Sequence, residues 1–196
     1  MELKFRDLRA DEIDCRIAMV KQSGLSLLLY KDARCDMNIL DETVGAFNWQ
    51  RSHTRDNANC IVSIYDEDKK QWVSKEDTGT ESNTEKEKGL ASDSFKRACF
   101  NWGIGRELYT APFIWVDASI CNLTNGKCYD KFAVADIKIE DKKIVYLKIV
   151  NISKKGAMVF ETGKSIKATA TPKAQPKQEV NSTIADALGG LPFDIM

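Results

Sequence analysis

The sequence lacks the features that mark several familiar classes of protein. Its 196 residues carry 29 Lys+Arg and 29 Asp+Glu, so no excess of basic charge points to a nucleic-acid partner. No apolar run approaches the roughly 18 residues that a membrane-spanning helix needs. The charged start "MELKFRDLRADEID" lacks the apolar centre of a secretory signal. We therefore expect a cytoplasmic protein with no membrane segment.

Metal binding and nucleophilic catalysis also have little support in the sequence. The six cysteines contain no CxxC pair and are expected to be reduced thiols. Cys121 and Cys128 leave structural zinc open, but without a second cysteine pair. Ser92 and Ser94 have no base nearby in the sequence, since the single histidine is His53. We expect no catalytic residue, no metal and no cofactor.

A small charged group keeps a nuclease open as an alternative. Asp136, Glu140, Asp141 and Lys142 resemble the carboxylate-plus-lysine grouping of metal-dependent nucleases. They surround an expected hairpin turn, however, where charged residues are common. This position favours an ordinary solvated turn.

Apolar spacing predicts two short helices in the first part of the chain. Ile13, Ile17 and Val20 have helical spacing ahead of Gly24, so a helix is expected there. The strand "LSLLLY" follows. A second helix is expected in "DMNILDETVGAFNW", with Asp36 as its N-cap and glycine as its terminator.

The middle of the chain predicts three strands and a long helix. The strands are "NWQRSHTRD", "CIVSIYD" and "QWVSKEDT", and "DEDKK" is a hairpin connection. Thr84 and Glu87 have capping-box spacing, and the helix is expected to end near Gly103. Its apolar side is expected to comprise Ala91, Phe95, Ala98, Cys99 and Trp102.

Together these elements predict an α+β fold, in which the apolar side of the long helix packs on the sheet of the preceding strands. "APFIWVD" is a further strand, "AVADIKIEDKKIVYLKIV" an additional C-terminal β-hairpin, and "GAMVFE" one more strand. We expect one domain over residues 1–161 and a disordered, flexible tail over 162–196. Its apolar tip is a candidate docking site for a partner protein, through Leu191, Pro192 and Phe193.

Two adjacent cations, Lys96 and Arg97, lie within the expected long helix. On a helical wheel Lys96 lies at the edge of the apolar side, whereas Arg97 projects nearly opposite, beside Asp93 one turn back. Periodicity alone therefore favours a solvated helix face with an Asp–Arg pair. The position of these two cations alone does not indicate a function. A function is indicated only by the similarity of the surrounding sequence to a known family.

Three stretches occur in one order along the chain: "KDARCDMNILDETVGAFNW", "VSIYDEDKKQWVSKEDTGTES" and "EKGLASDSFKRACFNWGIGRELYTAPFIW". Together they resemble phage single-strand annealing proteins of the Sak type, which are relatives of the eukaryotic Rad fifty-two annealing protein. The resemblance covers roughly residues 8–116. It implies a β-β-β-α core, assembly into a homo-oligomeric ring or filament, and annealing of single-stranded DNA without ATP.

The resemblance also implies which residues contact DNA. Arg34, Lys96 and Arg97 correspond to contacts with phosphates of the first strand, and Phe100 stands where some relatives have another basic residue. Lys69, Lys70 and Lys75 resemble positions that guide a second strand. A protective single-strand DNA-binding protein without annealing activity remains the alternative, because "LPFDIM" loosely resembles the partner-binding tip of bacterial single-strand binding proteins.

Overall fold

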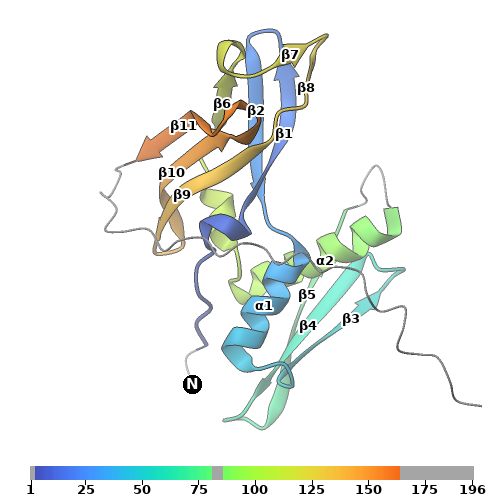
Figure 1. Ribbon diagram of the computed structural model, residues 1–196. Coiled ribbons are helices and arrows are strands. Elements are labelled where there is room, and N and C mark those ends of the chain that lie inside the picture. Colours follow the sequence, from blue (N-terminus) through green and yellow to red (C-terminus); the bar gives the residue numbers. More distant parts are fainter. Residues whose placement is uncertain (1–2, 81–85, 164–196) are drawn as a thin grey trace, which may run out of the picture. The chain divides into compact units, whose positions relative to one another are not determined.

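The computed structural model describes residues 3–80 and 86–163, so residues 164–196 of the expected tail, with its apolar tip, lie outside the described residues. Figure 1 shows how the helices and antiparallel sheets of the described residues are arranged. The elements in chain order are β1 (Asp14–Lys21), β2 (Gly24–Tyr30), α1 (Ala33–Val44), β3 (Trp49–Thr54), β4 (Asn59–Asp66), β5 (Gln71–Thr78), α2 (Lys86–Trp102), β6 (Ile114–Asp117), β7 (Leu123–Thr124), β8 (Lys127–Cys128), β9 (Phe132–Glu140), β10 (Lys143–Asn151) and β11 (Ala157–Gly163).

The expected β-β-β-α core is confirmed. β3, β4 and β5 form an antiparallel three-stranded sheet in that order, and α2 packs against β4 and β5 (Figure 1). Alternate residues of β4 are buried toward the helix, which meets them with its predicted apolar side. The fully buried side chains at this contact are Cys60, Val62, Phe95, Ala98 and Cys99.

A six-stranded sheet has the order β11-β10-β9-β1-β2-β6, and its hydrogen-bonded neighbours run antiparallel. The expected C-terminal hairpin is confirmed as β9 and β10, joined by a turn at Asp141 and Lys142, which both have positive φ. β11 pairs with β10 and runs to Gly163, slightly beyond the expected domain boundary. The whole arrangement confirms an α+β fold.

The first expected helix is wrong. Residues Asp14–Lys21 form β1, which pairs with β2 as a hairpin. The register shifts between Ile17 and Met19, where a bulge places one extra residue in the strand. Burial therefore recurs at Cys15, Ile17 and then Val20, and the extra residue converts an alternating pattern into one with helical spacing.

The second expected helix is confirmed as α1, but its N-cap is not Asp36. Asp32 has extended backbone angles, and its Oδ1 accepts a hydrogen bond from the amide of Cys35 at 2.9 Å. Asp36 lies inside the helix and is fully buried. Gly45 is the C-cap, as predicted, and its amide donates to the carbonyl of Asp41.

The long helix ends at Trp102, where the amide of Gly103 donates to the carbonyl of Phe100 and that of Ile104 to Cys99. Thr84, half of the expected capping box, lies outside the described residues. Within the described part of the chain, no helix combines the length and apolar character that crossing a membrane requires.

Candidate nucleic-acid interface

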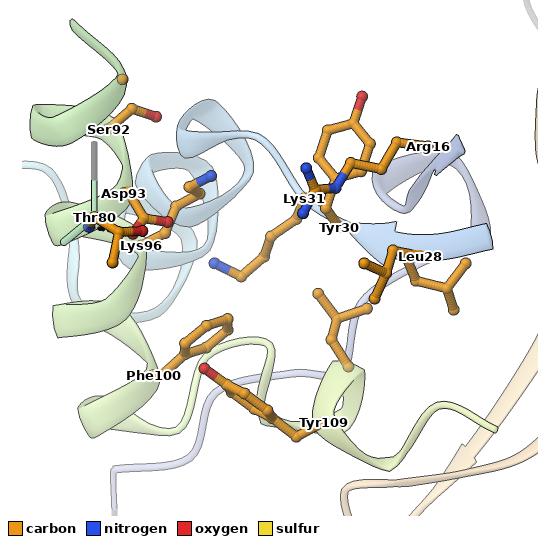
Figure 2. Close-up of a pocket in the computed structure, with 13 residues that line it drawn as sticks. Arg16, Leu28, Tyr30, Lys31, Thr80, Ser92, Asp93, Lys96, Phe100 and Tyr109 are labelled. Atoms are coloured by element: carbon orange, nitrogen blue, oxygen red, sulfur yellow. Dashed lines mark hydrogen bonds between the residues drawn. The ribbon is translucent and has the colours of Figure 1, made fainter. Parts of the chain in front are cut away.

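A cleft of about 890 Å³ lies beside α2, with walls from β1, β2, α2 and the short 3-10 helix Arg106–Thr110. Figure 2 shows the basic and aromatic side chains that face it. Segments far apart in the sequence contribute these side chains, which are Arg16, Tyr30, Lys31, Lys96, Phe100 and Tyr109.

Lys31 lies deepest among the cations of this cleft. It is 2% exposed, and its ammonium donates to both carboxylate oxygens of Asp36 at 2.5 Å. The same nitrogen lies 4.5 Å from the centre of the Phe100 ring. Gly105 has a φ of +73°, and a Cβ there would come within 2.3 Å of Lys31 Cε. A glycine is therefore needed for the lysine to lie in this place.

The carboxyl of Asp36 has an unusual protonation equilibrium. Burial raises its pKa to about 6, although the neighbouring charge of Lys31 and, more weakly, that of Lys96 act in the opposite direction. Asp36 consequently takes up a proton in mildly acidic solution. Its protonation removes the acid that offsets Lys31 and makes the cleft more positive.

Lys96 and Arg16 provide uncompensated charge at the cleft. Neither forms a hydrogen bond or ion pair with another residue of ranges 3–80 and 86–163. Lys96 is half-buried on α2, and Arg16 is exposed on β1. Among the described residues that line the cleft, Asp93 is the one carboxylate, and it accepts hydrogen bonds from the amide and hydroxyl of Thr80. This described part of the lining therefore has an excess of positive charge.

Arg34 and Arg97 do not line this cleft. The Arg34 side chain is 85% exposed, and its Nε lies 3.0 Å from a carboxylate oxygen of Asp32. The expected pairing of Arg97 with Asp93 is wrong, because Arg97 Nε instead faces Asp77 of β5 at 3.3 Å, with the side chain still 40% exposed. The structure therefore groups Lys96 with Arg16 and Lys31.

The three lysines expected to guide a second strand lie on the β4–β5 hairpin. Lys69 pairs with Asp66 at 3.3 Å and Lys70 with Glu67 at 3.1 Å, both across the turn. Lys75 donates to the carbonyl of Asn101 at 2.8 Å, and its ammonium lies 4.5 Å from the Trp102 ring centre. The lysines of the turn are exposed but locally compensated, whereas Lys75 packs against the end of α2.

His53 is close to Ser94, contrary to what their separation in the sequence suggests. Ser94 Oγ lies 3.4 Å from His53 Nδ1, and it also faces the carbonyls of Asn57 and Ala91. The serine is fully buried, and burial lowers the pKa of His53. A hydroxyl that no substrate can reach is a packing group, and this contact gives no nucleophile.

The charged group at the β9–β10 turn is spread over separate contacts. Lys142 donates to the carbonyls of Phe5 and Arg6 and pairs with Asp7 at 2.8 Å, while Glu140 pairs with Lys138. In the described ranges, no three His, Cys, Asp or Glu side chains gather as a metal-binding group. The described cysteines Cys121 and Cys128 are both free thiols.

Sequence reasoning missed two cations of the cleft. Arg16 was not identified as a cleft residue because its segment was expected to be a helix. The sequence did contain a signal for a β-hairpin, since two apolar segments of similar length flank the turn at Gly24. Lys31 lay in a stretch that carries the resemblance, but its contacts with Asp36 and Phe100 depend on how α1 and α2 pack.

Comparison of the chain with protein-family models, with curated proteins and with solved structures finds no match in any of the three.

Proposed function

We propose that this chain binds single-stranded DNA and anneals complementary strands, as a homo-oligomer and without ATP, in recombination or repair of bacteriophage type. The observation that carries the proposal is the convergence of Arg16, Lys31 and Lys96 on one cleft, with two of these cations lacking a carboxylate partner in the described ranges. The β-β-β-α order of β3, β4, β5 and α2 also agrees with the resemblance in the sequence.

Annealing requires two polyanions to approach each other while their bases stay free to pair. A cleft of lysine and arginine neutralises phosphates and leaves the base edges free, because such contacts carry little sequence information. This explains how a chain of zero net charge can bind DNA: the positive charge needed is local. Acidic residues on other parts of the chain bring the total to zero.

A homo-oligomer follows from the small number of cations in one cleft. Two unpaired cations hold a strand weakly, whereas a ring or filament repeats the cleft along the same strand and raises the effective concentration of each successive contact. Arg34 and Arg97, which lie outside the cleft, would then contact the strand between neighbouring copies. The proposed place of action is the host cytoplasm, in keeping with free thiols at all six cysteines.

The proposal is tested by binding of a labelled oligothymidylate at several salt concentrations. We expect Lys96→Gln to lower affinity about tenfold and to reduce the log–log salt slope by about 0.7, the value for one phosphate contact with a single strand. Lys127→Gln, an exposed lysine on β8 away from the cleft lining, is the matched control and should change neither quantity. Equal affinities and slopes for the wild type and Lys96→Gln would contradict the proposal.

A second measurement separates annealing from protection. An annealing protein accelerates duplex formation between complementary oligonucleotides, whereas a protective protein slows it. We expect acceleration by the wild type, and a weaker acceleration by Lys96→Gln at the same protein concentration.

A further inference from the structure

Tyr109 is a large aromatic side chain that the proposed phosphate contacts leave unused. It lines the basic cleft and is 69% exposed. Its ring packs edge-on against Phe100, with 5.0 Å between ring centres and an interplanar angle of 67°. Its hydroxyl forms no hydrogen bond with another described residue. An exposed ring of this size adjoining a functional cleft is a candidate contact surface.

Hydrogen bonds of the residues on both sides of Tyr109 hold its backbone segment in place. Before it, Arg106 donates to the carbonyls of Phe100 at 2.6 Å and Asn101 at 2.8 Å. After it, Thr110 Oγ1 donates to the carbonyl of Glu107 and accepts from the amide of Ile144 at 2.9 Å. The backbone is therefore held in place while the ring remains open, so a ligand would meet a surface that is already ordered.

The surroundings of the ring favour a flat, electron-rich ligand attached to an anion. Phe100, the ring that supports Tyr109, also lies against the ammonium of Lys31. Lys96 and Arg16 line the same cleft, and Figure 2 shows Phe100 between the Lys31 ammonium and Tyr109. A nucleotide has both parts: its phosphate suits the cations, and its base suits the exposed ring.

We propose that Tyr109 forms a stacking subsite for one unpaired nucleobase at the mouth of the cleft. This inference rests on the proposed function and adds a contact to it. Stacking uses the face of a base and leaves its hydrogen-bonding edge available, so the contact is compatible with pairing to a second strand. It tolerates any base, and it would fix the position of the strand relative to the phosphate contacts.

The test compares an ordinary oligodeoxynucleotide with an abasic polymer of the same length, which keeps the phosphates and lacks the bases. We expect Tyr109→Leu to bind the ordinary strand about tenfold more weakly than the wild type, because base–aromatic stacking is lost. Its affinity for the abasic polymer and its salt slope should stay unchanged. Tyr109→Phe keeps the ring and should bind both polymers as the wild type does.

Tyr129→Leu is the matched control, since Tyr129 is 81% exposed and does not line the cleft. It should bind both polymers normally. The stacking subsite is overturned if Tyr109→Leu binds the ordinary strand as tightly as the wild type, or if it loses the same affinity for both polymers. A wild-type chain that binds neither polymer would overturn the proposed function itself, and the subsite with it.

Discussion

The cleft and the turn of the β4–β5 hairpin both display cations, but the turn pairs its lysines with carboxylates, whereas the cleft leaves two of its cations without an ion-pair partner among the described residues. On the hairpin, Lys69 and Lys70 each have a carboxylate three residues earlier, within 3.3 Å. In the cleft, Lys96 and Arg16 come from different elements and have no ion-pair partner among the described residues. The number of lysines in the sequence would suggest that the hairpin is the more basic surface. The ion pairs in the structure show instead that more unpaired positive charge lies at the cleft.

The difference has a physical cause. A tight turn brings its own charged residues together, so acidic and basic residues that are neighbours in the sequence neutralise one another. The cleft instead gathers residues from separate elements, and Asp36, the buried acid next to the cleft, is already engaged by Lys31. The charge available to a ligand therefore depends on tertiary placement.

The largest expected effect concerns the buried pair that supports the cleft. Lys31→Met should lower the free energy of unfolding at pH 7 by about 3–5 kcal/mol, because it leaves the buried Asp36 without its partner. Chemical denaturation measures this. The double variant Lys31→Met/Asp36→Leu should recover much of the loss, since no buried charge remains. A double variant as unstable as the single one would show that the pair does not act as a unit.

The next effect compares the two basic regions directly. Replacing both Arg16 and Lys96 by Gln should weaken binding of single-stranded DNA about hundredfold, if each charged contact contributes about 1.5 kcal/mol. The matched double variant of Lys69 and Lys70 should change affinity less than about threefold, because exposed ion pairs on the surface contribute little. Equal losses in the two double variants would remove the distinction between cleft and hairpin.

Much of the core was predictable because its periodic patterns are regular. The apolar side of α2, with Phe95, Ala98 and Cys99, follows a helical repeat. The strands of the sheet are separated from one another by polar turns. β1 was misassigned for a local reason: the bulge after Ile17 adds a residue, and apolar positions then recur at a helix-like distance. Single-sequence periodicity cannot distinguish that bulge from a short amphipathic helix.

The candidate site was only partly predictable. Lys96 was identified through the resemblance, and its position at the edge of the apolar side follows from the helical wheel. The partner of Arg97 was not predictable, because Asp93 one turn away competes with Asp77 on a strand whose register the sequence does not specify. Asp36 was expected to be an N-cap, and its burial opposite Lys31 depends on how α1 packs against α2.

A smaller effect should appear in the pH dependence of stability. The pKa of Asp36 is about 6 in the folded chain, above its usual value, so its contribution is present in acid and is lost as the pH rises through about 6. The free energy of unfolding of the wild type, relative to Asp36→Asn, should rise by on the order of 2 kcal/mol between pH 7 and pH 4. A constant difference would contradict the raised pKa.

The smallest effect tests whether Arg97 belongs with the free or the compensated cations. Asp77→Asn removes its partner at 3.3 Å and should tighten binding of single-stranded DNA about two- to threefold, because an exposed ion pair is worth less than about 1 kcal/mol. Arg97→Gln should weaken binding by a similar factor, well short of the loss caused by Lys96→Gln. If Arg97→Gln lost as much affinity as Lys96→Gln, Arg97 would have to exchange Asp77 for phosphate when DNA binds. The interface would then extend from the cleft to the β5 side of α2.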